Sequence, residues 1–193
     1  MLSSKESLKV LRKTNALLEG HFVLSSGLHS DRYIQCAKLL SFPKLSQKIC
    51  HSLSRRIKKK FKQIDLILSP AVGGIVIGYE IGKILNKETI FCERVNKKFT
   101  LRRGFQIKKN AKVLIVEDVI TTGKSSLECS KLVLDNEANI VGYACLINRS
   151  NGKSSIKGKI VSQVELNIPT YTEENLPSSL STLKAVKPGS RNL

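Results

Sequence analysis

The segment that most restricts the possible fold is Val113–Ser126, with the sequence VLIVEDVITTGKSS. It begins with four consecutive apolar residues, most of them β-branched, which is typical of a strand buried on both faces of a parallel sheet. Two adjacent carboxylates, Glu117 and Asp118, follow this run, and we expect them where the strand reaches the surface. A turn rich in hydroxyl groups comes next, and Ser125–Asn136 is predicted to be a helix.

The turn between the acids and the predicted helix has the chemistry of an anion site. It contains Thr121, Thr122, Gly123, Lys124 and Ser125. The first N–H groups of a helix lack partners within the helix and carry the positive end of its dipole, so a phosphate group is favoured there. Carboxylates beside an anion site fit a ligand that carries both hydroxyl groups and phosphate, such as a ribose phosphate.

Two other interpretations of this segment have less support. An ordinary βα connection with a polar loop binds nothing, but it gives no reason for two acids at a strand end followed by TTGKSS. A P-loop ends in Gly-Lys-Ser, as Gly123–Ser125 does, but it needs a glycine five positions before its final glycine, where Asp118 stands. We therefore exclude the P-loop.

Strand and helix patterns alternate along the rest of the chain. A capping box at Ser3 starts a helix that the leucine spacing extends through Leu18, and His21–Gln35 is predicted to form two short strands around a turn. Further helices are predicted at Pro43–Phe61 and Ile75–Asn86, and further strands at Ile64–Ser69, Thr89–Cys92, Ile140–Ile147 and Lys159–Leu166. This alternation predicts an α/β fold with a parallel, Rossmann-like sheet flanked by helices.

Polar residues follow four of the predicted strands. They are Ser69-Pro70, Glu93-Arg94, Glu117-Asp118 and Asn148-Arg149. The carboxyl ends of parallel strands meet at one edge of the sheet, and ligands of such folds bind beyond that edge. The sequence therefore predicts one site that draws residues from all four strands.

The net charge of +18, from 33 Lys and Arg against 15 Asp and Glu, suggests polyanionic partners. Because the positive residues are spread along the chain without a nucleic-acid motif, we expect no nucleic-acid partner. The apolar stretches are too short to cross a bilayer, and the N-terminus lacks a signal-peptide core. The five cysteines form no CxxC pair. We expect a soluble, cytoplasmic protein that does not bind membranes.

Val113–Ser126 resembles the phosphoribosyl-pyrophosphate signature of the type I phosphoribosyltransferases. Four further segments extend the resemblance nearly end to end and point to the orotate phosphoribosyltransferases within that family: Gly20–Gln35, Ser69–Gly74, Glu93–Phe105 and Leu146–Arg149. The signature alone indicates only the superfamily. The N-terminal segment and the LRRGF sequence select the orotate enzymes.

The resemblance implies the type I phosphoribosyltransferase fold in a single domain over residues 1–193. Residues 1–40 would contribute a small hood over the base site, and residues 168–193, rich in Pro, Ser and Thr, would form an irregular tail. It implies an Mg²⁺-dependent glycosyltransferase (a pentosyltransferase) that transfers the ribosyl 5-phosphate group from phosphoribosyl pyrophosphate to orotate. The products would be orotidine 5′-monophosphate, for pyrimidine synthesis, and pyrophosphate. We expect a stand-alone transferase without a decarboxylase domain.

The resemblance also assigns site residues. Phosphoribosyl pyrophosphate would be bound by Arg94, Lys98, Glu117, Asp118, Val119, Ile120, Thr121, Thr122, Gly123, Lys124 and Ser125, and orotate by Thr121 and Arg149. Among these, Arg94, Lys98 and Asp118 would be catalytic, whereas the Lys124 side chain is equally compatible with phosphate and with solvent. Since Mg²⁺ prefers oxygen ligands and keeps several waters, we expect substrate oxygens to hold it and no all-protein metal site.

The basic segment Arg94–Gly104 is predicted to be a mobile surface loop and a lid over pyrophosphate. In the resembled family this loop reaches the neighbouring subunit, which implies a homodimer with shared active sites. Many relatives carry a basic residue or histidine at four positions that are uncharged here: Ser25, Gly73, Val95 and Thr100.

Two rival functions remain open at this point. A purine-base phosphoribosyltransferase would share the signature, but the hood segment and Arg149 argue against it. A regulator that keeps the sugar-phosphate pocket and binds nucleic acid would explain the +18 charge, but the intact lid segment argues against it.

Overall fold

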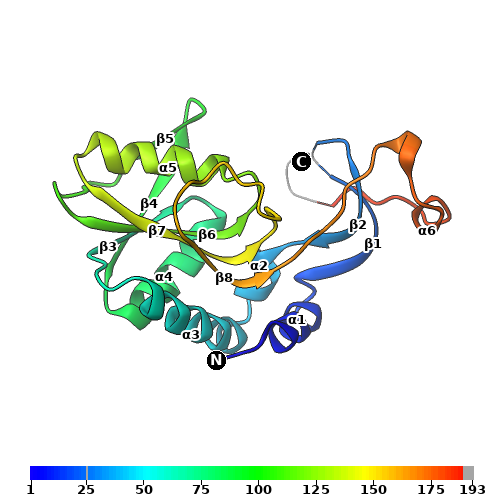
Figure 1. Cartoon of the computed structure of the whole chain (residues 1–193), viewed down its shortest axis with the longest axis horizontal. Helices are drawn as coiled ribbons and strands as arrows, with labels where there is room; N and C mark the ends of the chain where they lie inside the picture. Colours follow the sequence, from blue (N-terminus) through cyan, green and yellow to red (C-terminus); the bar gives the residue numbers. More distant parts are fainter. Residues whose placement is uncertain (25, 189–193) are drawn as a thin grey trace.

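The computed structural model describes residues 1–24 and 26–188, so Ser25 lies outside the described residues. A six-stranded sheet forms the centre, with strand order β5-β4-β3-β6-β7-β8 (Figure 1). The strands are β3 Leu66–Pro70, β4 Glu88–Val95, β5 Lys98–Leu101, β6 Lys112–Ile120, β7 Asn139–Asn148 and β8 Ile160–Glu165. All neighbouring pairs are parallel except β4 and β5. The predicted α/β fold is confirmed, but the antiparallel edge strand β5 was not predicted.

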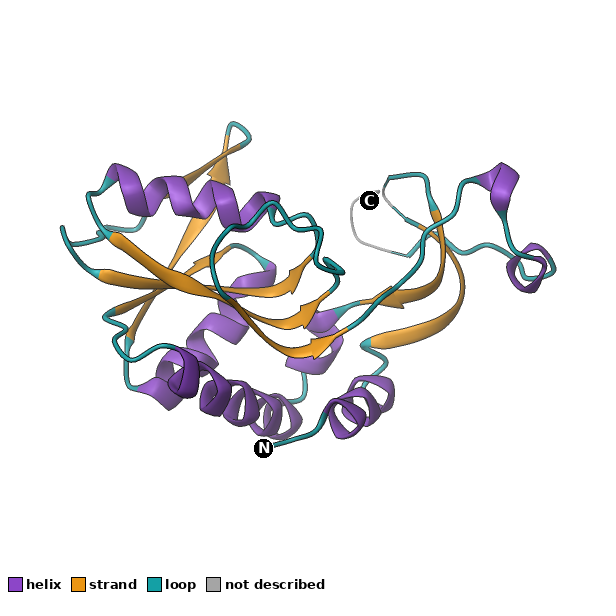
Figure 2. Ribbon diagram, viewed as in Figure 1, coloured by secondary structure: helices purple, strands orange, loops and turns teal. Residues whose placement is uncertain are grey.

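Helices cover both faces of this sheet (Figure 2). Helices α3 (Pro43–Lys60) and α4 (Gly73–Leu85) lie on one face, and α5 (Lys124–Asp135) lies on the other. The apolar stripe of α3 explains its position, because its isoleucines and Leu53 are buried in the same core cluster as residues of α4 and β7.

Side chains of β6 alternate between the two cores. Val113 and Ile115 belong to the cluster that includes α5, whereas Leu114 and Val116 belong to the cluster that includes α3 and α4. Because successive side chains of a strand point to opposite faces, the next residue, Glu117, falls on the α5 side. Asp118 then falls on the α4 side.

A small antiparallel hairpin precedes the sheet. Strands β1 (Leu17–Val23) and β2 (His29–Ile34) pair with each other, and the short helix α2 (Cys36–Leu40) leads into α3. The two short strands predicted around a turn are confirmed. Helix α2 was not predicted.

The first helix is shorter than predicted. Helix α1 is Ser4–Lys13, and its predicted capping box at Ser3 and Glu6 is present. The chain leaves the helix at Thr14 and Asn15, where Asn15 has φ +54°, and Leu17 then begins β1. The extension through Leu18 was therefore wrong, because Leu17 and Leu18 are strand residues whose spacing happened to continue the helical stripe.

The C-terminal segment returns to the hairpin. It is mostly irregular, with a 3₁₀ turn at Glu173–Asn175 and the short helix α6 at Ser178–Ser181. Tyr171 exchanges two backbone hydrogen bonds with His29, and Val186 exchanges two with His21 and Val23. The described part of the predicted irregular tail is thus docked on the β1–β2 hairpin, while residues 189–193 lie outside the described residues.

The predicted lid is largely regular. Over Arg94–Leu101 it forms the β4–β5 hairpin, with Asn96 and Lys97 at the turn and both at positive φ. Such a pair of left-handed residues is typical of a two-residue turn that matches strand twist. The expectation of a loop was therefore wrong for this half of the segment.

Candidate functional site

The two acids lie inside β6 and not after it. Pairing of β6 with β3 ends at Ile115, but pairing with β7 continues through Glu117 to Ile120. The prediction that the strand ends at Val116 was therefore wrong, because pairing with β7 alone extends it. The consequence is that the acids remain fixed by strand geometry on opposite faces of the sheet, near its carboxyl edge.

Glu117 faces the beginning of α5. The Ser126 hydroxyl in the first turn of that helix donates a hydrogen bond to Glu117 Oε2. Burial raises the pKa of Glu117 from its usual 4.5 to about 7, and the charge of Asp118 acts in the same direction, while Ser126, Ser125 and Arg94 oppose the rise. Glu117 is therefore a carboxyl group that titrates near neutrality in the unliganded protein.

Asp118 faces the beginning of α4 on the other side of the sheet. A Cβ atom added to Gly73 would lie 2.9 Å from Asp118 Oδ2, so this carboxylate lies directly against the first residue of the helix. The Val119 N–H donates to Asp118 Oδ1 at 2.9 Å. Burial raises the pKa of Asp118. Two helix N-termini, one on each face, thus meet at two neighbouring acids.

The bend after the acids is left open to a ligand. Gly123 has φ +83°, and a Cβ atom there would lie 2.7 Å from Ile156 Cγ1, so both conformation and space require glycine. The loop after β7 supports the bend from behind, since the Ser155 N–H donates to Thr122 O at 2.9 Å. The N-cap of α5 has no side-chain capping bond, and Thr122 Oγ1 reaches the Lys124 N–H only at 3.4 Å.

The predicted phosphate residues differ in exposure. Thr121, Thr122 and Lys124 are exposed, and Val119 and Ser125 are half-buried. Ile120 is different, because its side chain is 1% exposed and belongs to the core, and its carbonyl accepts the Arg149 N–H at 2.8 Å. Ile120 would therefore contribute to a site only by supporting the backbone of the bend.

Arg94 lies beside the α5 side of the site. Its guanidinium forms an ion pair with Glu128 of α5 at 2.5 Å and donates to Lys97 O at 2.8 Å. It also stacks on Phe99, with Cζ 4.1 Å from the ring centroid. Its charge is close enough to lower the pKa of Glu117, so the structure brings Arg94 and Glu117 together.

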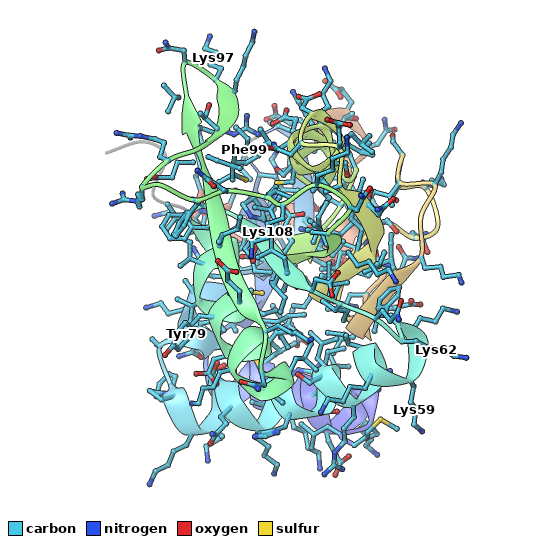
Figure 3. The ribbon with its side chains drawn as sticks, turned by 90° about the vertical axis from the view of Figure 1, so that its left-hand side faces the viewer. Lys59, Lys62, Tyr79, Lys97, Phe99 and Lys108 are labelled. Atoms are coloured by element: carbon cyan, nitrogen blue, oxygen red, sulfur yellow. The ribbon has the colours of Figure 1, made fainter. Side chains whose placement is uncertain are left out.

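Lys98 is not brought to the acids. It is exposed at the start of β5, next to Lys97, which Figure 3 shows at the tip of the hairpin. The hairpin projects beyond α5 in Figure 1. Val95 and Thr100, two of the uncharged positions, are also exposed on this hairpin.

Arg149 follows β7 at the same edge of the sheet. Burial lowers the pKa of its guanidinium, and its Nε is buried without a hydrogen-bond partner among the described residues. A buried, unsatisfied donor on a cation is costly, so this group is suited to an anionic ligand. The sheet edge therefore combines an open amide-lined bend, two acids and two arginines.

Comparison with known proteins agrees with this geometry. The family model described as "Phosphoribosyl transferase domain" matches residues 36–178. The chain is 44% identical to the orotate phosphoribosyltransferase of Methylorubrum extorquens (strain PA1) over 193 residues, covering 100% of this chain and 98% of that protein. It is 42% identical to that of Parvibaculum lavamentivorans, with both chains fully covered. The chain belongs to the orotate phosphoribosyltransferase family.

A solved orotate phosphoribosyltransferase has the same fold. The enzyme from Aeropyrum pernix superposes with a TM-score of 0.73 at 25% identity, covering 82% of this chain and 92% of that one. The matches to the Methylorubrum and Parvibaculum proteins run along the whole chain, so they include the N-terminal hairpin and the C-terminal segment as well as the signature.

Two features of this family member were missed from sequence. Neither the bond from Ser126 to Glu117 nor the ion pair of Glu128 with Arg94 was predicted. The available signal was position, because residues near the start of a helix that follows a strand lie close to the end of that strand. Sequence alone does not give the rotation of the helix, which decides which of these residues face the acids.

Two kinds of feature are absent from the described part of the chain. Within it, no group of three or more His, Cys, Asp or Glu side chains is arranged to hold a metal ion. No helix there combines the length and the apolar character needed to cross a bilayer.

Proposed function

We propose that this chain transfers the ribosyl 5-phosphate group from phosphoribosyl pyrophosphate to orotate, in the synthesis of pyrimidine nucleotides. The main observation behind this proposal is that two helix N-termini, one on each face of the sheet, meet at Glu117 and Asp118. A sugar with a phosphate at one end and a pyrophosphate at the other needs two anion sites with hydroxyl acceptors between them. Family membership supports orotate as the acceptor base.

The 5′-phosphate would lie in the bend after β6. The backbone N–H groups of residues 121–125 would bind it, with hydroxyl groups from Thr121, Thr122 and Ser125. The absence of a capping side chain at the N-cap of α5 supports this role, because the first N–H groups of the helix keep capacity for a ligand. Lys124 is exposed at the same place and would add positive charge.

Glu117 and Asp118 would accept hydrogen bonds from the 2′- and 3′-hydroxyl groups of the ribose. When pyrophosphate leaves, positive charge develops on the ring, and two carboxylates held by the sheet would stabilise it without reorganisation. Asp118 is the better placed of the two toward the leaving group, because it lies against Gly73 at the start of α4. This assigns it the catalytic role.

Pyrophosphate would lie on the turn at residues 71–74, where α4 begins. Arg94 would contribute charge from the α5 side, and Lys98 would complete the site from the hairpin. A Mg²⁺ ion fits the donors that are present, since Asp118 offers carboxylate oxygen and the substrate offers the rest. When bound, Mg²⁺ would neutralise charge on the pyrophosphate.

Arg149 and Thr121 would bind orotate. The unsatisfied Nε of Arg149 would donate to the orotate carboxylate, for which a planar guanidinium offers parallel N–H groups. The hood hairpin would cover the base. We infer that residues 1–193 act as one domain, because Leu11 of α1 and Leu17 of β1 share a core cluster with α3 and β7.

We also propose a homodimer with shared active sites. Three side chains form an exposed apolar stripe on one side of α4: Val72 is 82% exposed, Val76 46% and Tyr79 64%. Figure 3 shows Tyr79 at the surface. A second copy would cover this stripe, and the family resemblance implies that the projecting hairpin of one subunit then reaches the site of the other. Light scattering should give a dimer, and Tyr79→Lys should give a monomer with reduced turnover.

Loss of orotate absorbance on adding phosphoribosyl pyrophosphate is the direct test. The wild-type protein should consume orotate with Mg²⁺ and lose activity when EDTA removes it. Turnover with adenine or another purine in preference to orotate would contradict the proposal in favour of the purine-base rival. Salt-dependent binding of RNA without any base-dependent release of pyrophosphate would favour the nucleic-acid regulator that the +18 charge suggests. The five buried free thiols are compatible with a reducing, cytoplasmic setting.

A further inference from the structure

We infer that Glu128 is a positioning residue that holds Arg94 in a conformation ready to bind pyrophosphate. This inference rests on the proposed function, which places Arg94 at the pyrophosphate. Glu128 lies in the second turn of α5, on the helix that follows the phosphate bend. The ion pair therefore connects the lid hairpin directly to the helix that presents the 5′-phosphate site.

The Arg94 guanidinium is held from three directions. Glu128 contacts one terminal nitrogen at 2.5 Å, the Lys97 carbonyl accepts from the other at 2.8 Å, and the Phe99 ring lies 4.1 Å below Cζ. Phe99 is itself buried in the cluster that contains α5, and Figure 3 shows it on the hairpin. A long flexible side chain is thereby restricted to one orientation before any ligand arrives.

This arrangement leaves capacity for a ligand. A guanidinium has five N–H donors, and the contacts with Glu128 and Lys97 use only two of its nitrogens. The remaining donors can bind pyrophosphate oxygens while Glu128 stays in place. The Arg94 side chain is 41% exposed, so a ligand can reach it, whereas the Glu128 side chain is only 29% exposed.

The contact also differs from an ordinary surface ion pair. The backbones that carry it are packed together, since the buried thiols of Cys92 in β4 and Cys129 in α5 are 3.3 Å apart. Each cysteine is within two residues of the charged partner on its own element. The two charges therefore meet without the loss of freedom that makes most exposed ion pairs weak. Preorganisation of this kind raises affinity by removing an ordering cost from the binding step.

Glu128→Gln tests the inference, with Glu137→Gln as the matched control. Glu137 follows the same helix and pairs with Lys109 at 2.7 Å, but both side chains are more than half exposed. Glu128→Gln should raise KM for phosphoribosyl pyrophosphate about tenfold, the effect of one freed side chain. KM for orotate and the unfolding midpoint should stay at the wild-type values. The control should change none of these quantities.

A second comparison separates positioning from a general structural role. In an Arg94→Ala background, Glu128→Gln should have no further effect on KM, because the group that it orients is gone. Calorimetric binding of magnesium pyrophosphate should show the same pattern without turnover. An unchanged KM, a lowered KM, or an equal loss in both backgrounds would overturn the inference. A wild-type protein that binds magnesium pyrophosphate but leaves orotate unchanged would overturn the proposed function instead, and the binding pattern would still decide the role of Glu128.

Discussion

Replacing Glu117 by glutamine should make the unliganded protein more stable at alkaline pH than the wild type. Glu117 is largely buried beside α5, and this burial, together with the charge of Asp118, raises its pKa from 4.5 to about 7. Ionising the carboxyl group in the folded protein is therefore unfavourable relative to the unfolded chain. Glutamine has nearly the same shape and does not ionise. Its side-chain oxygen can still accept a hydrogen bond from the Ser126 hydroxyl.

The size and sign of the effect follow from linkage. Between pH 4.5 and 7 the folded protein binds more protons at this site than the unfolded chain, so the wild-type free energy of unfolding falls as pH rises. A difference of about 2.5 pH units at about 1.4 kcal/mol per unit amounts to about 3 kcal/mol. This contribution to stability is fully present below pH 4.5 and fully lost above pH 7. The Gln variant carries no such dependence.

The assay is urea unfolding of both proteins from about pH 5 to about pH 8.5, analysed as the difference in free energy of unfolding. Titrating groups that do not interact with Glu117 cancel in this difference. It should be about 1 kcal/mol at pH 5 and grow to about 3 kcal/mol in favour of Glu117→Gln, with the steepest change below pH 7. A difference that stays constant across the range would refute the argument that burial raises this pKa.

The same substitution should separate stability from catalysis. The amide oxygen can accept a hydrogen bond from one ribose hydroxyl, but the neutral amide cannot stabilise positive charge in the transition state as a carboxylate does. We expect kcat to fall by about 100-fold, comparable to the loss of one preorganised electrostatic contact. A more stable protein with lower turnover would show that the site holds an unfavourable ionisation for the sake of the reaction.

Three further substitutions test separate parts of the site. Gly123→Ala combines a positive φ with a Cβ atom 2.7 Å from Ile156, so calorimetry should show a loss of about 1–3 kcal/mol and the assay a raised KM for phosphoribosyl pyrophosphate. Gly73→Ala would place Cβ 2.9 Å from Asp118 Oδ2, so kcat should fall about tenfold while the unfolding midpoint changes little. Arg149→Gln should raise KM for orotate by at least about tenfold and leave KM for phosphoribosyl pyrophosphate unchanged, because the amide cannot pair with a carboxylate as a cation does; equal changes in both would contradict this assignment.

The strand alternation in β6 was the part of the site most accessible from sequence. An apolar run followed by two acids predicts that the acids point to opposite faces, and the contacts of Glu117 with Ser126 and of Asp118 with Gly73 confirm it. The length of the strand was not accessible, because β6 continues to Ile120 only through pairing with β7. Long-range pairing of this kind depends on residues about 30 positions away, which local propensity does not report.

The β4–β5 hairpin shows a different limit. Its sequence is charged and was predicted to be a mobile loop, yet Phe99 and Leu101 alternate with exposed residues and Asn96 can adopt positive φ without great cost. Those two signals were present in the sequence. The many lysines and arginines favoured the prediction of a loop. Charged residues indicate that a segment is exposed to solvent, but they do not determine its backbone conformation.

The positions of the two acids also explain why neighbouring carboxylates can have separate functions. A helix would place consecutive residues about 100° apart, and a loop would leave them free, but a strand turns them to opposite faces. Glu117 therefore meets the hydroxyl of Ser126 at one helix N-terminus, and Asp118 meets Gly73 at another. In the proposed complex each acid would lie close to one anion site, and the sheet itself would separate it from the other. A substrate that carries anions at both ends can then be held across the edge of β6, with its sugar between the two carboxylates.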